Sequence, residues 1–149
     1  MKIESQSMMK NVISEVLETM FFIMINFDGL NSSHRAYDFE SRIDLCNESE
    51  KLQIGLCVRE HFAKMVAANF VGKRDEEVEN EEMEDVMKEL ANMVGGNYMS
   101  KIASKNWQLG IPSFGRFEGG DDSQSTTSVS LFYMGENVGM LIVRPYVVT

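Results

Sequence analysis

Hydrophobic residues recur along this chain in two different periods, and the longer period predicts three helices. Residues 7–27 carry apolar side chains at helical spacing and become apolar on every side in "MFFIMI" at 20–25, which predicts a helix with a buried second half. Residues 59–72 show the same period and end at Gly72, a residue type that often closes helices. An acidic run then leads into a longer predicted helix over 76–104, where the helix dipole favours carboxylates in the first turns.

The shorter period, in which apolar and polar residues alternate, predicts strands. It covers 36–46 and 52–58, with the turn "NESEK" between them. It returns at 127–145, where "GEN" separates two apolar runs as in a β-hairpin. The Gly- and Pro-rich segment before this hairpin is expected to be mostly loop, with one short strand near 107–111.

The order of these elements predicts the fold class. A chain of 149 residues is long enough to bury a sizeable core and is expected to form one domain over 1–149. Helix, hairpin, helix, long helix and a β-rich end together predict an α/β (α+β) two-layer domain. We expect one antiparallel sheet that contains all the main strands, with helices 7–27 and 76–104 packed on one of its faces.

Composition and charge exclude several classes of partner. A formal net charge of −9 disfavours both nucleic acid and an anionic membrane surface, because each requires clustered Lys and Arg. The longest apolar run is far too short to span a bilayer, and no secretory signal is visible, so we expect the chain in the cytoplasm. Cys46 and Cys57 lack any metal-binding spacing and are expected to be reduced thiols.

The most informative stretch is "DVMKELANMVGGNY" at 85–98. With a turn of about 100° per residue, its apolar residues gather on one side of a helix. Four other residues gather on the opposite side, where they form a polar row that faces solvent: Asp85, Glu89, Asn92 and Gly96. The row also has a purely structural explanation, because any helix that packs one side on a core keeps a solvated polar face on the other side.

Three residues of this stretch are poor choices for an ordinary helix. Asn92 lowers helix propensity by about 0.6 kcal/mol relative to Ala, and Gly95 and Gly96 each lower it by about 1 kcal/mol if the helix continues through them. The glycines could instead end the helix, although the apolar pattern continues to Ile102. If the helix does continue, Gly96 removes bulk beside the amide of Asn92, which would permit close approach by another protein.

An acid and an amide in one row are suited to a limited chemistry. A carboxamide offers one acceptor and two donors without titrating near neutrality, so Asn92 could orient a water molecule for in-line attack. Glu89 could bind a cation or a lysine. A single helical row is a poor metal site without ligands from a second element, and His34 and His61 have no matching ligand spacing, so we expect no bound metal.

The first predicted helix contains a weak echo of the row. Aligning "SEVLETMF" with "DVMKELAN" matches Ser14 with Asp85, Glu18 with Glu89, and Phe21 with Asn92. Chance similarity between two amphipathic helices would also give three such positions.

Together, Asp85, Glu89 and Asn92, with Pro112 about twenty residues later in "LGIPSF", resemble the motif of the CheC/CheX/FliY family of chemotaxis phosphatases. That motif is an Asp or Ser, three residues, Glu, two residues, Asn and a later Pro. The single complete motif, the first helix and the "VGMLIV" strand are most similar to CheX.

The resemblance implies a function for the row. Family members hydrolyse the phospho-aspartate of CheY-like response regulators, which would make Asn92 the residue that orients the attacking water and Glu89 the partner of the regulator's active-site lysine. Asp85 and Gly96 would then contact the regulator. Mg²⁺ would belong to the regulator, so no cofactor of the chain's own is expected.

The resemblance also bears on assembly and on the echo. CheX-like proteins form sheet-mediated dimers, which implies a homodimer. Some relatives carry two active helices, and Phe21 in place of Asn would leave the first helix catalytically silent. The alternative to a phosphatase is a non-catalytic CheX-like module that docks a response regulator or another signalling protein.

Overall fold

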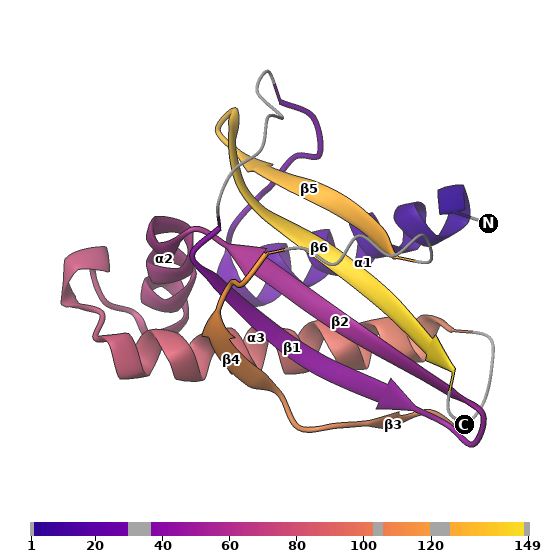
Figure 1. Cartoon of the computed structure of the whole chain (residues 1–149). Helices are drawn as coiled ribbons and strands as arrows, with labels where there is room; N and C mark the ends of the chain where they lie inside the picture. Colours follow the sequence, from indigo (N-terminus) through magenta and orange to yellow (C-terminus); the bar gives the residue numbers. More distant parts are fainter. Residues whose placement is uncertain (1, 30–36, 103–105, 120–125, 148–149) are drawn as a thin grey trace.

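A computed structural model of the chain describes residues 2–29, 37–102, 106–119 and 126–147. These residues form three α-helices, a short 3₁₀ helix and six strands (Figure 1). In chain order the elements are α1 (Lys2–Phe21), β1 (Phe39–Cys46), β2 (Glu50–Val58), α2 (Glu60–Val71), η1 (Asp75–Glu77), α3 (Asn80–Lys101), β3 (Gln108–Leu109), β4 (Ser113–Arg116), β5 (Thr127–Tyr133) and β6 (Glu136–Val147).

All six strands belong to one antiparallel sheet. The strand order is β3-β1-β2-β6-β5, and β4 also pairs with β1 beyond the end of β3. The longest pairing joins β2 to β6 in the middle of the sheet, with Ile54 opposite Val143. The three predicted strand regions therefore share one sheet, and the predicted α/β two-layer fold is confirmed.

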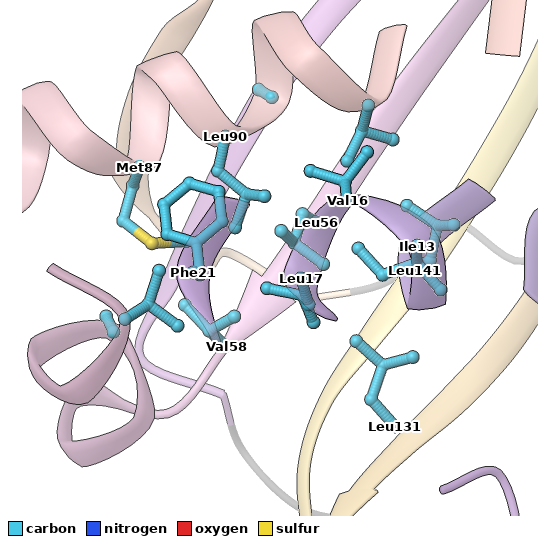
Figure 2. Packing of buried hydrophobic residues seen from close by; sticks show 14 of the residues in the cluster. Ile13, Val16, Leu17, Phe21, Leu56, Val58, Met87, Leu90, Leu131 and Leu141 are labelled. Carbon is cyan, nitrogen blue, oxygen red and sulfur yellow. The ribbon is translucent and has the colours of Figure 1, made fainter. Parts of the chain in front are cut away.

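The helices lie together on one face of this sheet (Figure 1). α3 contacts β1 and α1 contacts β5, while the two helices also contact each other. Figure 2 shows the buried side chains between these layers, which include Ile13, Leu17 and Phe21 of α1, Met87 and Leu90 of α3, and Leu56, Val58, Leu131 and Leu141 of the strands. The core therefore fixes the helices against the sheet and leaves their outer faces to solvent.

The elements are arranged with an approximate two-fold relation about the β2–β6 pair. β1 flanks β2 and β5 flanks β6, so the two strand hairpins occupy equivalent places. α3 packs on the outer strand of the first hairpin and α1 packs on that of the second. This arrangement agrees with the sequence echo between α1 and α3.

The predicted extent of the first helix is wrong. α1 ends at Phe21 because the next residue, Phe22, has a left-handed backbone with φ of 59°. Ile23 is then buried, whereas Phe22 and Met24 are 76% and 72% exposed, so the apolar run alternates between core and solvent as an extended chain does. The backbone of Asn26 then pairs with Phe132 of β5. A short apolar run has the same appearance whether it is a buried helix end or a strand.

The third helix is shorter than its predicted range of 76–104 at both ends. It begins at Asn80 with a capping box between Glu79 and Glu82, because the acidic residues before it form η1. It continues through both glycines to Lys101, so the alternative in which the glycines end the helix is wrong. By contrast, the second helix matches its prediction closely and closes at Gly72, whose φ is 75°.

The segment between α3 and the hairpin contains more strand than predicted. The short strand expected near 107–111 is β3, but 113–116 was expected to be loop and is β4. The missed strand is held by backbone pairing along β1, such as Phe114 opposite Ser41, and Gly or Pro residues on each side hide it from a pattern search. His34, and residues 120–125 of the segment that was expected to be mostly loop, lie outside the described residues.

Candidate functional site

The polar row lies on the solvent side of α3. Asp85 and Glu89 are exposed, whereas Asn92 and Gly96 are half-buried. The opposite side of the same helix is buried in the core through Met83, Val86, Met87, Leu90, Ala91, Val94 and Tyr98. A row on a packed helix is held more rigidly than one on a loop, which suits groups that must be positioned for a partner.

The side chains of the row have no partner within the described part of the chain. Asp85, Glu89 and Asn92 form no hydrogen bond or ion pair there, although other charged residues of α3 do. Lys88 pairs with Glu84 at 3.2 Å, and the Nζ of Lys73 lies 2.7 Å from Glu82. These lysines therefore neutralise neighbours of the row, and the row itself keeps two carboxylates and a carboxamide free.

The electrostatic environment of the row is acidic. Glu81, Glu82 and Glu84 occupy the first turns of α3 ahead of Asp85. The hydrogen bond from Lys73 lowers the pKa of Glu82, and the backbone N–H of Glu79 lowers it further. A face with this excess of negative charge attracts a partner that presents a lysine.

The two adjacent glycines of α3 have different surroundings. A Cβ added to Gly95 would lie 2.9 Å from side-chain atoms of both Ile43 and Leu109, so the helix packs against β1 and β3 at this turn. A Cβ added to Gly96 would meet nothing within 4 Å. Packing therefore explains Gly95, and no contact within the described chain explains Gly96.

Pro112 lies near the same turn of α3, in the connection between β3 and β4. It is half-buried, and the connection begins where the N–H of Gly110 donates to the carbonyl of Asp44 at 2.7 Å. Because Leu109 lies against Gly95, this connection is beside the helix one turn after Asn92. The structure thus brings the third helix and the Gly-Ile-Pro connection together.

The matching positions of α1 do not form a second row. Ser14 is half-buried and Glu18 is exposed, but Phe21 is fully buried and stacks on Phe70 with ring centroids 5.0 Å apart. An aromatic ring in the core cannot present a polar group to a partner. The structure therefore places an acid on the outer face of α1 but a buried ring at the position that matches the amide of Asn92.

Other candidates for chemistry have structural explanations. His61 lies 3.6 Å from Glu136 on the surface, and burial raises the pKa of the Cys57 thiol to about 12, which keeps it protonated and unreactive. Among the residues that the structure describes, no group of three or more His, Cys, Asp or Glu side chains could hold a metal ion. Nor does any described helix have the length and apolar character to cross a bilayer.

The fold and the row define a class of protein in which a helix packed on an antiparallel sheet carries an acid and an amide on its outer side. The chain belongs to the CheX family. The family model described as "Chemotaxis phosphatase CheX" matches residues 41–133, which is more than half of the chain and includes α3.

Solved structures of CheX and related chemotaxis proteins have the same fold. Chemotaxis protein CheX from Vibrio vulnificus is 18% identical, with a TM-score of 0.74 over 93% of this chain and 95% of that chain. A putative chemotaxis protein from Desulfovibrio vulgaris Hildenborough is 14% identical, with a TM-score of 0.76 over 96% and 97% of the two chains. The CheX–CheY–BeF₃–Mg²⁺ complex from Borrelia burgdorferi matches at 15% identity and a TM-score of 0.72 over 93% and 96%. No curated protein sequence matches the chain significantly.

Proposed function

We propose that this protein is a phosphatase that hydrolyses the phospho-aspartate of a CheY-like response regulator. The observation that carries the proposal is that α3 holds Glu89 and Asn92 on one outer stripe with their side chains free of partners within the described chain. Membership of a family described as chemotaxis phosphatases, and the likeness to a CheX that was solved in complex with CheY, support the choice of reaction and partner.

In this mechanism Asn92 enters the active site of the regulator and orients the attacking water. The carboxamide can accept a hydrogen bond from the water and donate another to the phosphoryl group, without acting as a strong base. The water oxygen forms a new bond to phosphorus as the bond from phosphorus to the aspartate oxygen breaks, which yields inorganic phosphate and a free carboxylate. Mg²⁺ is supplied by the regulator, which is the substrate, so the phosphatase needs no cofactor of its own.

The other residues of the row act in docking. Glu89 pairs with the active-site lysine of the regulator, and the acidic surroundings of the row steer that lysine toward it. Asp85 lies one turn earlier on the same stripe and contacts the rim of the regulator. Gly96 lies one turn after Asn92, where the missing side chain leaves room for the regulator surface to approach the helix.

A non-catalytic docking module of the same fold is the alternative function. The intact pair of Glu89 and Asn92 favours catalysis, because docking alone would not require an amide at a helix position where Ala is about 0.6 kcal/mol more favourable. The side-chain amide of Asn92 has no partner within the described chain, so it is available to enter the regulator and hydrogen-bond to a water molecule there.

A time course of regulator dephosphorylation distinguishes the two functions. The phosphorylated regulator from the same organism is followed with Mg²⁺, alone and with the wild-type protein or the Asn92→Ala variant. We expect the wild type to accelerate the loss of phosphate and the variant to lose most of that acceleration. Binding of the regulator without any acceleration would identify the docking module instead.

We further propose that the protein acts in the cytoplasm as a homodimer. Within the described residues, the edge formed by β3 and β4 pairs with no further strand, and β5 has only the single bridge from Asn26 to Phe132 beyond it. Such open edges invite pairing with another chain. Sedimentation at micromolar concentration is expected to detect a species of twice the 16.9 kDa chain mass. A single 16.9 kDa species would contradict the dimer.

A further inference from the structure

The edge segment that joins β3 to β4 has one more residue than the stretch of β1 opposite it. Leu109 pairs with Leu45 and Ser113 pairs with Arg42, so two residues of β1 lie opposite the three residues 110–112. One extra residue in an edge strand is a bulge, a device that changes the direction of a side chain and is common beside active sites.

The first residue of this bulge is hydrogen-bonded to β1, whereas its middle residue is exposed. The N–H of Gly110 donates to the carbonyl of Asp44 at 2.7 Å, and a Cβ on Gly110 would lie only 3.1 Å from the same carbonyl. Pro112 fixes its own φ and has no N–H to donate, which suits a position where the pairing is interrupted. Between them, Ile111 is 91% exposed.

The position of Ile111 relative to the row follows from the packing of α3. The side chains of Ile43 and Leu109 both lie against Gly95, and the bulge passes directly outside Ile43 on the neighbouring edge strand. Two extended residues span at most about 7 Å, so Ile111 is close to the turn that carries Gly95. On the same helix, Asn92 lies one turn before Gly95, and Gly96 is the residue directly after Gly95. In Figure 1 the β3–β4 connection runs along this edge of the sheet, beyond β1.

An exposed isoleucine on an open sheet edge is a liability. Apolar side chains on an edge strand promote pairing with other chains, and proteins usually place charges or Pro there. The bulge presents Ile111 without giving it any core contact, although a polar residue would be tolerated equally well at a site this exposed. The combination of a bulge, a neighbouring proline and an apolar side chain beside the row indicates a contact surface.

We propose that Ile111 is an apolar anchor for the regulator, which docks on the bulge and on the row of α3 at the same time. The inference rests on the proposed function, because the occupant is the phosphorylated receiver domain whose active site takes up Asn92. Ile111 would bury its side chain against an apolar patch on that domain beside its active site. Its role is affinity and choice of regulator, and Asn92 performs the chemistry.

The test is the affinity of CheY-type receiver domains from the same organism, activated with beryllofluoride and Mg²⁺ in place of the phosphoryl group. Wild type is compared with Ile111→Ala, Ile111→Asp and the control Met134→Asp. Met134 is a matched control because it is also apolar and is 85% exposed. It lies in the turn between β5 and β6, which are the strands farthest from β3 in the sheet. The variants are also used in dephosphorylation assays to separate KM from kcat.

We expect Ile111→Asp to weaken binding and raise KM at least tenfold with kcat within twofold of wild type, Ile111→Ala to have a smaller effect of the same kind, and Met134→Asp to have none. Equal affinities for wild type and Ile111→Asp would overturn the anchor while leaving the phosphatase intact. A similar loss in Met134→Asp would also overturn it, because the effect would then be that of any charge added to the surface. If no activated regulator binds the wild type, the proposed function itself fails.

Discussion

The two long helices of this domain lie at equivalent places in the fold, but they carry different residues at matching positions. α1 and α3 lie on the same face of the sheet, each against the outer strand of one hairpin. Both present a glutamate to solvent, Glu18 on α1 and Glu89 on α3. Three residues later, α1 has Phe21 in the core and α3 has the half-buried amide of Asn92.

The two helices therefore differ most at the residue one turn after the glutamate. Phe21 stacks on Phe70, and its carbonyl accepts a hydrogen bond from the side chain of Asn69, so the end of α1 is anchored in the core. The helix stops there. α3 instead continues for more than two turns past Asn92 and tolerates two glycines in doing so. The end of α1 therefore adds to the stability of the core. The second half of α3 keeps a polar surface, and its Asn and Gly residues lower helix propensity.

The largest expected effect concerns the stability of α1. Truncating Phe21 to Ala should lower the free energy of unfolding by about 3 kcal/mol, because a fully buried ring is replaced by a cavity. Chemical denaturation measures the loss. Dephosphorylation per folded molecule should be unchanged, and a specific catalytic defect in this variant would mean that α1 also takes part in the site.

The adjacent glycines of α3 provide a matched pair. Gly95→Ala should lower the free energy of unfolding by about 1 to 3 kcal/mol, because its Cβ would lie 2.9 Å from Ile43 and Leu109. Gly96→Ala should raise it by about 1 kcal/mol through helix propensity, since the new methyl group would meet no atom of the described residues within 4 Å. The same Gly96→Ala protein should bind the regulator more weakly. Unchanged affinity would remove Gly96 from the proposed interface.

The two exposed glutamates provide a second matched pair, one on each helix. Glu89→Ala should weaken regulator binding and turnover by up to about tenfold, equivalent to about 1.4 kcal/mol, if Glu89 pairs with a lysine of the regulator. The difference from wild type should shrink at high salt, which screens an exposed ion pair. Glu18→Ala should match wild type at every salt concentration. Equal losses in the two variants would point to the overall negative charge of the face and away from a specific pair.

Much of the fold can be predicted from residue periods, and the exceptions have identifiable causes. Alternation correctly located β1, β2 and the β5–β6 hairpin, and helical spacing located α2 and α3. The segment after Phe21 misled because Phe22, Ile23 and Met24 are apolar in either conformation, and only the left-handed backbone of Phe22 separates helix from extended chain. β4 was missed because it is only four residues long and mostly exposed, with Phe114 as its one half-buried residue, and because Pro112 and Gly115 are residue types typical of loops.

The arrangement of the row on α3 could be predicted in part. Helical geometry alone gave the shared stripe of Asp85, Glu89 and Asn92, and the first two are exposed as predicted, whereas Asn92 is half-buried and not fully exposed. The separate roles of Gly95 and Gly96 could not be predicted, because the difference depends on Ile43 and Leu109, which are distant in the sequence. The exposure of Ile111 likewise depends on a register that sequence spacing does not reveal.

The proposed mechanism requires that the row on α3 performs chemistry on a regulator that it binds. The decisive measurement determines, for wild type and Asn92→Ala, both the affinity for the beryllofluoride-activated regulator and the dephosphorylation rate at saturating phosphatase. We expect Asn92→Ala to keep its stability and an affinity within a fewfold of wild type while its saturated rate falls to near that of the regulator alone, because an Asn→Ala change on the outer side of a helix is neutral or slightly stabilising. A saturated rate in the variant equal to that of wild type would contradict the mechanism.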